Sequence, residues 1–355
     1  MTRPNYLPST YDIFIGIDVG KNSFSFTVED EKDMMRSKTI PSNPEQFFYY
    51  IEKTYADKRI LFAYEAGPTG YHLYDYLTAK NYDCLVVSPN AIPKASNERV
   101  KNNRIDSRKI AHYLKAGHLT SIRVPTGPYR ELRHLVRIRE IYATKRKVAK
   151  QRIKALLLYA NLYPYIKDSD NKWSNRYIQS LKEIPSSDAV RIRLDMLLMD
   201  LDYARKQILS IHRQMRSFVK NQPDIHKNVQ YLQSIPGIGF ITATDILGKI
   251  GDPVNLKDLR ELACFVGLTP TERSTGDVIN QGSITHLGNK NLRRLLIESA
   301  WVAIRRDTEL DQFFHRIKSR NNPKCASQIA ITAVARKLTQ RIYRVLKDQR
   351  NYTIH

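Results

Sequence analysis

The sequence predicts an α/β domain, then a helical middle section with a coiled-coil seam, then a mainly helical last domain. Three observations carry this prediction. Short apolar runs alternate with helix-like segments over residues 11–125, which is typical of a sheet flanked by helices. Within residues 126–225, the apolar residues from Leu194 onward follow an unbroken heptad pattern. A proline–glycine turn between apolar segments opens residues 226–345, and helix-like segments follow it.

The first strand is the apolar run Phe14–Ile17, which ends at Asp18 and is followed by Gly20 and Lys21. Apolar residues on both sides of the chain indicate a strand covered on both faces. A carboxylate at the end of such a strand lies where open α/β sheets bind their ligands. The alternative is an aspartate in the turn that leaves the strand.

The remaining elements of the first domain alternate in the same way. Residues 23–28 predict a hairpin partner for the first strand, and two later strands are expected at residues 59–65 and 82–88. Helices are expected at residues 44–55, with the capping signal Ser42/Asn43 before them, and at residues 71–77. A basic segment, residues 101–109, leads into a further helix at residues 110–116.

Three acidic residues of this domain are candidates for one site. Asp18 and Glu65 end strands, and Asp106 lies in the basic segment, so we expect all three to converge at one edge of the sheet. Carboxylates held together repel one another unless a cation lies between them, and their hard oxygens suit Mg²⁺ or Mn²⁺. Two such ions about 3.5–4 Å apart can activate a nucleophile at a phosphodiester. The alternative is three unrelated surface acids.

The charge balance indicates a polyanionic partner. The chain has 58 lysines and arginines against 35 aspartates and glutamates, a net charge of +23, and a pI near 9.8. Nucleic acid is the first expectation and a membrane surface the second. However, no apolar run approaches the roughly 18–20 residues of a membrane span, and no N-terminal signal peptide is recognisable. Three separated cysteines, Cys84, Cys264 and Cys325, fit neither a zinc cluster nor a disulfide framework and predict a reducing cytoplasm.

More than half of the excess charge lies in residues 94–154, which hold 18 lysines and arginines against four acids, a net +14. Residues 129–162 predict one long helix in this region, and its imbalance of sign favours a surface that follows phosphates. The alternative is a solvated helix face. The basic residues that we expect to contact nucleic acid here and nearby are Lys21, Lys101, Arg104, Arg108, Arg133, Arg137, Lys147 and Lys150.

A second long helix follows an irregular stretch at residues 163–185. Its apolar residues are spaced by four and three, so a coiled-coil seam is expected. The seam either folds back on the preceding helix or pairs two protomers, and a dimer would suit a protein that handles two DNA sites. The seam residues are Val190, Leu194, Leu197, Leu201, Ala204, Ile208, Ile211, Met215 and Phe218.

The last domain opens on Ile235-Pro236-Gly237-Ile238-Gly239, the pattern of a helix-hairpin-helix. Gly237 and Gly239 would let backbone N–H groups approach a phosphate; the alternative is a plain turn. The segments 267–276, 282–285 and 288–294 combine hydroxyls and glycines with basic residues, so they predict either phosphate binding or a loop rich in turn residues. Further basic contacts are expected at Lys290, Arg293 and Arg294, and helices at residues 292–305 and 329–346.

Five motifs in this order resemble the DEDD-type transposases of bacterial insertion sequences. This group is related to pilin-gene DNA invertases and includes the bridge-RNA-guided recombinases. The motifs are Gly16-Ile17-Asp18-Val19-Gly20-Lys21, Glu65-Ala66-Gly67-Pro68-Thr69-Gly70-Tyr71, the segment from Val100 to Ser107, Ile235-Pro236-Gly237-Ile238-Gly239, and Gly267-Leu268-Thr269-Pro270 through Arg294.

The resemblance implies a RuvC-like (RNase H-like) domain at residues 11–125, a basic helix and coiled coil at 126–225, and a transposase domain with a helix-hairpin-helix and a nucleophile loop at 226–345. It also implies four acids that hold divalent metal, a serine that attacks DNA, and an active site shared between protomers. The implied partners are donor and target DNA, a structured guide RNA, and further copies of the chain in a homodimer or homotetramer, in the bacterial cytoplasm.

Two family positions differ in this chain. Asp18, Glu65 and Asp106 match the first, second and fourth acids, but the third falls on Asn103, whose amide oxygen can ligate a metal without bringing negative charge. The position of the serine falls on Thr275, with Ser274 one residue earlier. The resemblance thus implies an RNA-guided DNA recombinase, with a catalytically impaired RNA- and DNA-binding regulator or a RuvC-like junction resolvase as the alternatives.

Overall fold

The structure is a computed structural model, and it describes residues 6–89, 92, 102–165, 173–272, 281–285 and 287–353. The chain divides into two compact units, Met1–Val124 and Pro125–His355. The second unit contains both the middle section and the last domain that the sequence predicts as separate parts. Each unit is described by itself.

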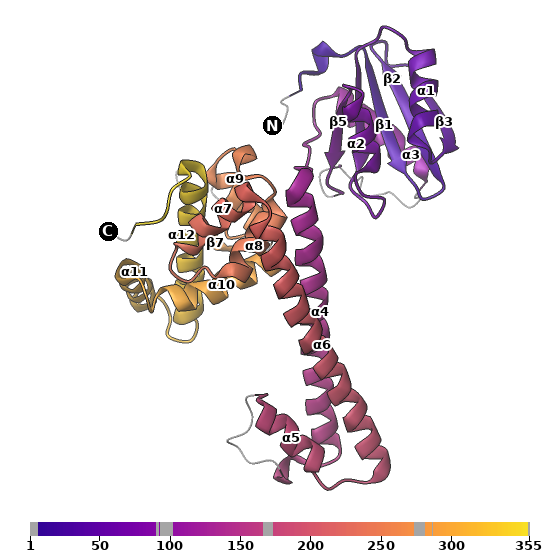
Figure 1. Cartoon of the computed structure of the whole chain (residues 1–355). Helices are drawn as coiled ribbons and strands as arrows, with labels where there is room; N and C mark the ends of the chain where they lie inside the picture. Colours follow the sequence, from indigo (N-terminus) through magenta and orange to yellow (C-terminus); the bar gives the residue numbers. More distant parts are fainter. Residues whose placement is uncertain are drawn as a thin grey trace. The chain divides into compact units, whose positions relative to one another are not determined.

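The first unit is built on a five-stranded mixed sheet with the order β3-β2-β1-β4-β5 (Figure 1). The central strand β1 is antiparallel to β2, which is antiparallel to β3, whereas β4 runs parallel to β1 and β5 runs parallel to β4. This confirms the predicted α/β class. The strands are β1 (Ile13–Val19), β2 (Ser23–Asp30), β3 (Met35–Pro41), β4 (Ile60–Glu65) and β5 (Asp83–Val87).

Helices cover both faces of this sheet. On one face α1 (Pro44–Thr54) and α2 (His72–Ala79) bury an aromatic core that includes Phe26, Phe47 and Phe62. On the other face α3 (Asn103–Lys115) packs Ile110 and Leu114 against the sheet. The helix α3 begins seven residues before the predicted helix 110–116, because the Asn102 side chain caps its first turn and the basic residues face outward.

The second unit begins with a long helical hairpin. The helices α4 (Gly127–Tyr159) and α6 (Asp188–Lys220) pack against each other along their length, with α5 (Asn175–Glu183) at the connection (Figure 1). The apolar seam of α6 therefore folds back on α4 within the chain. Its buried residues include Leu198 and Val219, one position after the predicted Leu197 and Phe218, which are only partly buried. A straight helix of 3.6 residues per turn drifts from a strict heptad in this way.

The rest of the second unit is mainly helical and shares one core with the adjoining ends of α4 and α6. Tyr129, Val136 and Met215 of the hairpin pack with Leu232 and Leu338 of the later helices. One core therefore continues across the predicted boundary near residue 225, while the far part of the hairpin has a core of its own with α5. The elements are α7 (Pro223–Gln233), α8 (Phe240–Ile250), α9 (Leu259–Val266), β6 (Pro270–Glu272), β7 (Gln281–Ile284), α10 (Lys290–Ala303), α11 (Thr308–Ser319) and α12 (Ala326–Asp348).

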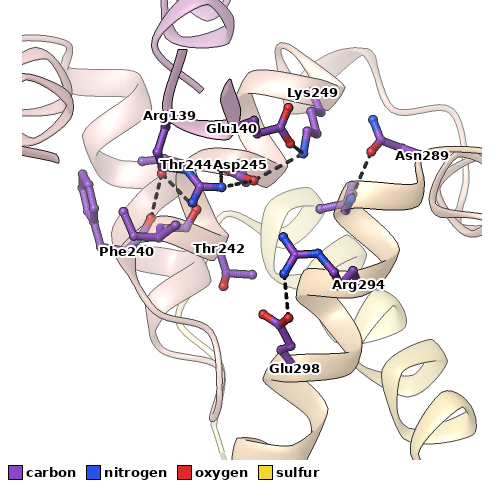
Figure 2. Close-up of polar contacts among 12 residues, drawn as sticks. Arg139, Glu140, Phe240, Thr242, Thr244, Asp245, Lys249, Asn289, Arg294 and Glu298 are labelled. Atoms are coloured by element: carbon purple, nitrogen blue, oxygen red, sulfur yellow. Dashed lines mark hydrogen bonds and ion pairs between the residues drawn. The ribbon is translucent and has the colours of Figure 1, made fainter. Parts of the chain in front are cut away.

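A buried group of charges joins α4 to α8 (Figure 2). The Arg139 guanidinium donates to both carboxylate oxygens of Asp245, at 3.0 and 3.1 Å, and the Asp245 side chain is fully buried. The Lys249 ammonium lies 3.3 Å from Asp245 and 2.6 Å from Glu140. Two cations and two carboxylates thus balance inside the unit, and they fix the rotation of α4 relative to α8.

Gly16 is a position where a side chain cannot be accommodated. A Cβ there would lie 2.3 Å from the Ala111 nitrogen and 2.3 Å from the Ser107 oxygen, both in the backbone of α3. We expect Gly16→Ala to lower the free energy of unfolding by about 1–3 kcal/mol, since α3 must move off the sheet. Chemical denaturation measures this. Gly67→Ala is the control, because its Cβ would meet one atom at 3.9 Å; equal stability of the two variants contradicts the packing.

Arg139→Met should destabilise the protein by about 3 kcal/mol, because it removes a cation from the buried Asp245 carboxylate. The double variant Arg139→Met/Asp245→Leu should regain most of this loss, since Lys249 keeps Glu140 as its partner. Thermal and denaturant unfolding measure both. The control is Lys206→Met, which breaks the exposed Lys206–Asp202 pair and should cost less than about 0.5 kcal/mol. A double variant no more stable than the single one contradicts a charge-pairing role.

Candidate catalytic edge and nucleic-acid surface

Asp18 and Glu65 lie at the ends of neighbouring parallel strands. The register pairs Ile17 of β1 with Tyr64 of β4, so the next residue of each strand is one of these acids. Partners in a parallel pair point to the same face of the sheet. Ile17 and Tyr64 belong to the core under α1 and α2, so Asp18 and Glu65 belong to the opposite face, which α3 covers. Asp18 is half-buried and Glu65 is exposed.

The first turn of α3 brings Asn103 and Asp106 to this same face. The helix starts at Asn103, and the Asn102 side chain accepts the Arg104 backbone N–H at 3.0 Å. Asp106 follows Asn103 by three residues, so both side chains lie on one side of the first turn. Asp106 is half-buried and Asn103 is exposed. All four positions implied by the family resemblance therefore lie on the α3 face of the first unit.

Ser107 fixes the start of α3 on the sheet. Its hydroxyl is buried and lies 2.9 Å from the Thr27 hydroxyl of β2. The close approach of α3 to β1 at Gly16 occurs at the same level, since Gly16 pairs with Thr27. These contacts set where the first turn of α3, and with it Asp106, stands relative to β1.

A row of hydroxyls crosses β2 and β3 beside this edge. Ser25 contacts Thr39 at 3.0 Å, and Thr27 contacts Ser37 at 2.9 Å. Ser25, Ser37 and Thr39 line a small cavity of about 220 Å³, together with Lys38, Arg104 and Ser107. Of the residues around this cavity, only Arg104 was predicted from the sequence as a functional contact. The sequence pattern that could have indicated the hydroxyl row is the alternation Ser23-Phe24-Ser25-Phe26-Thr27-Val28. It places the hydroxyls on the face of the sheet opposite the aromatic core.

The donor chemistry at this edge fits a hard divalent cation, since three carboxylates and one amide oxygen lie on one face. Within the part of the chain that the structure describes, no three of its His, Cys, Asp and Glu side chains form a group that could hold a metal ion. The metal site at Asp18, Glu65 and Asp106 stays a prediction.

Three of the predicted site residues, Lys101, Ser274 and Thr275, lie outside the described residues. Of the other basic residues predicted in the first unit, Lys21 lies in the turn after β1, and Arg104 and Arg108 lie on α3; all three are exposed.

The predicted basic helix is confirmed as α4, and its charges line a groove in the second unit. The groove has a volume of about 1220 Å³ and lies between α4 and α10. Lys147 and Lys150 line it from α4, and Lys290 and Arg294 line it from α10. Arg133 and Arg137 lie on α4 but not among the groove residues; Arg137 is exposed and Arg133 is half-buried. Part of the predicted basic surface is thus gathered into one cleft.

Arg293 has a structural position that differs from its predicted role. Its side chain is buried, and its guanidinium donates to the backbone carbonyls of Val266 at 3.1 Å and Leu287 at 2.9 Å. It holds the end of α9 against the start of α10. Because these carbonyls occupy the guanidinium, we do not include Arg293 in the proposed nucleic-acid surface.

The proline–glycine motif forms the turn between α7 and α8. Gly237 has a φ of +88°, and a Cβ there would lie 2.4 Å from the Ser299 carbonyl oxygen of α10. Close packing with α10 thus explains why residue 237 is a glycine. Gly239 precedes α8, and nothing lies within 4 Å of the place its Cβ would take. The phosphate-binding role of this turn stays a prediction.

No helix in the described ranges is long and apolar enough to cross a membrane.

Two transposase family models match the chain. One, described as a transposase of the IS110 DEDD type, matches residues 15–161, and the other, described as the transposase IS116/IS110/IS902 family, matches residues 229–315. The first covers the whole acidic edge, and the second covers the α7–α8 turn and the groove helix α10.

Known proteins of the same kind are similar along most of the chain. The protein y4qE of Sinorhizobium fredii is 28% identical over 83% of this chain and 77% of its own length. The transposase for insertion sequence element IS1111A of Coxiella burnetii is 25% identical, over 82% of this chain and 78% of its own. The pilin gene-inverting protein of Moraxella bovis is 23% identical, over 96% of this chain and 97% of its own.

The mixed α/β sheet and the helical remainder are consistent with a DEDD nuclease-like fold, and both family models name the same group of enzymes. The chain belongs to the IS110 family of insertion-sequence transposases.

Proposed function

We propose that this protein is an RNA-guided, metal-dependent DNA recombinase that cuts and rejoins element and target DNA through a Ser or Thr phosphodiester. The observation that carries the proposal is the matched register of Asp18 and Glu65, together with Asp106 on the helix that covers the same face. Membership of a transposase family supports DNA as the substrate. Similarity to a pilin gene-inverting protein over nearly the whole chain supports recombination.

In this proposal Asp18, Glu65 and Asp106 hold Mg²⁺ or Mn²⁺, with the Asn103 amide oxygen as a neutral fourth ligand. Such an ion, when bound, supplies positive charge to the phosphate oxygens and to the leaving oxygen. Ser274 or Thr275 supplies the hydroxyl that bonds to phosphorus as the strand's own oxygen leaves. Attack by the freed end on that phosphodiester then regenerates the hydroxyl and rejoins the DNA.

The protein's basic surfaces have a separate task in this scheme. A guide RNA and two DNA partners require contacts to many phosphates, and the net charge of +23 supports such contacts. Pairing between RNA and DNA would select the sites, so the protein need not read bases in the duplex. A homodimer or homotetramer would bring two DNA partners together.

A second candidate function rests on one observation, Asn103 in place of an acid. A weakened metal site would leave an RNA- and DNA-binding regulator with the same fold. A junction resolvase that uses water as the nucleophile is the third possibility, and it would form no covalent protein–DNA adduct.

Asp18→Ala should abolish recombination, since it removes a carboxylate that holds the proposed cation. The assay uses the cognate guide RNA with donor and target DNA and counts recombined junctions. Glu52→Ala is the control, because Glu52 is an exposed acid on α1, which covers the other face of the sheet. Full activity of Asp18→Ala contradicts the site, and equal losses in both variants indicate a defect in folding.

Asn103→Asp should raise DNA cleavage and lower the Mg²⁺ concentration for half-maximal activity by about tenfold, because it adds a charged ligand. Asn102→Asp is a matched control: it adds the same charge one residue earlier and keeps a capping oxygen. A gain in Asn103→Asp alone supports an impaired metal site. No gain favours the regulator.

Ser274→Ala and Thr275→Ala, made singly and together, should identify the nucleophile. The variant without the attacking hydroxyl should form no covalent protein–DNA adduct after denaturing gel electrophoresis, while DNA binding persists. Ser283→Ala is the control hydroxyl, exposed on β7. Adducts that survive in the double variant exclude both residues as nucleophiles.

A further inference from the structure

The groove between α4 and α10 has a charge excess that its own acids do not balance. Eight lysines and arginines line it against two glutamates, and of the eight, Arg139 is paired with the buried Asp245 and Arg293 donates to backbone carbonyls. Both glutamates are already paired, Glu140 with Lys249 at 2.6 Å and Glu298 with Arg294 at 2.7 Å. Among the described residues, no ion pair involves Lys147, Lys154 or Lys290. The groove therefore presents positive charge that lacks a counter-charge from the protein.

The lysines of α4 form a continuous line. Lys147, Lys150 and Lys154 are spaced by three and four residues, so they lie on one side of the helix. Burial and the neighbouring charges of Arg146, Arg205 and Lys154 lower the pKa of Lys150. An anion in the groove would relieve this repulsion, because it would place negative charge between like charges.

Both tryptophans of the chain, Trp173 and Trp301, line this groove. Trp301 lies on α10 in line with Lys290 and Arg294, and it is 39% exposed. The edge of Phe314 supports it, with ring centres 5.7 Å apart. An indole this exposed among charged residues has surface available to a ligand.

Trp173 is supported in the same way. Tyr177 packs against it at nearly a right angle, with ring centres 5.3 Å apart, and the Trp173 carbonyl accepts a hydrogen bond from Arg205. The Lys150 ammonium lies 5.0 Å from the centre of its ring. A line of cations beside two anchored indoles is the combination that binds unpaired bases, with phosphates on the lysines and bases on the rings.

The groove is long enough for several nucleotides. Its α4 side runs from Arg139 to Lys154, which is roughly 22 Å at the helical rise of 1.5 Å per residue. A strand stacked as in a duplex, at ~3.4 Å per nucleotide, would place about six nucleotides in that length, and an unstacked strand spans it with fewer. A duplex keeps its bases stacked inside, so it would use the lysines and leave both indoles without a partner. An acidic peptide would likewise lack stacking bases.

We propose that the α4–α10 groove binds an unpaired stretch of polynucleotide, with its phosphates along Lys147, Lys150 and Lys154 and its bases on Trp301 and Trp173. This inference rests on the proposed function only in that the partner is a nucleic acid. The inference adds that the α4–α10 groove is the part of the molecule that holds this nucleic acid, and that the nucleic acid held there is single-stranded. Guide RNA and opened DNA both offer such a stretch.

Intrinsic tryptophan fluorescence tests the proposal directly, because both indoles of the full-length chain line the groove. Purified protein freed of nucleic acid is titrated with 12-nucleotide oligouridine RNA, 12-nucleotide oligothymidine DNA, a 12-base-pair duplex and polyglutamate. We expect an unpaired strand to quench the emission, and a preference between the first two probes identifies the source of the strand. Equal quenching by duplex or by polyglutamate overturns the proposal.

Substitutions separate the indoles from the charges. Trp301→Leu should weaken single-strand binding by about tenfold or more and change duplex binding little. Lys147→Gln should weaken binding to both and reduce the slope of log K against log salt by about 0.7 for single strands. Lys145→Gln is the matched control, on the same helix but outside the groove. Circular dichroism verifies folding, and unchanged single-strand affinity in folded Trp301→Leu overturns the proposal.

The variant Asp18→Ala separates the test of groove binding from the test of the proposed recombination activity. Its quenching should equal that of the unchanged protein, since Asp18 belongs to the first unit. If the groove binds single strands and recombination is absent, the proposed function fails while the inference stands. If recombination occurs without groove binding, only the inference fails.

Discussion

The close approach of α3 to β1 at Gly16 is the constraint on which the acidic edge depends. Only hydrogen fits between the two backbones there, so the helix rests directly on the strand. The Ser107–Thr27 contact at 2.9 Å then fixes the helix along its axis. With these two points set, the first turn of α3 lies on the face to which Asp18 and Glu65 belong. The β1–β4 register thus places Asp18 and Glu65 on one face, and packing at Gly16 brings the first turn of α3 with Asp106 to that face.

A polar contact has the corresponding role in the second unit. Ridges of apolar side chains let two helices slide and rotate with little loss, whereas a buried carboxylate tolerates only the arrangement that pairs it. Asp245 on α8 has Arg139 of α4 and Lys249 within reach. Arg139 and Glu140 also line the groove. The orientation of the basic face of α4 is thus coupled to an interior contact, which charge pattern alone would not reveal.

The sequence predicted the elements that have a strong periodic signal. The strands β1, β4 and β5 are continuous apolar runs, and α4 and α6 are long amphipathic patterns. The edge strand β3 was missed because its polar residues face solvent and its hydrogen bonds to β2 hold it in place. The helices α5, α9 and α11 were also not predicted from the sequence. They are short, and their stability comes from packing against longer helices.

Sequence reasoning predicted where a residue lies when that residue ends a strand, but it could not predict groups of residues that only the fold brings together. Asp18 and Glu65 were expected at strand ends, and they lie there at matching positions of β1 and β4, whereas their role as metal ligands stays a prediction. The row from Ser25 to Thr39 forms only when β2 and β3 pair. Arg293 has the composition of a phosphate contact, but α9 ends beside it and its carbonyls take the guanidinium. The two tryptophans are 128 positions apart in the sequence, and only the fold places both of them along the groove.

Asn103 is not required by the architecture around it. The adjacent Asn102 caps α3, and within the described residues no hydrogen bond involves the Asn103 side chain, which is exposed. An asparagine in a helix has no advantage in propensity over aspartate, and a helix N-terminus favours negative charge. What the amide does change is the field at Asp106 one turn along, since two carboxylates at this spacing repel each other. An acid would therefore fit the helix at this position as well as the amide does, so the identity of residue 103 matters to the site's chemistry rather than to its fold.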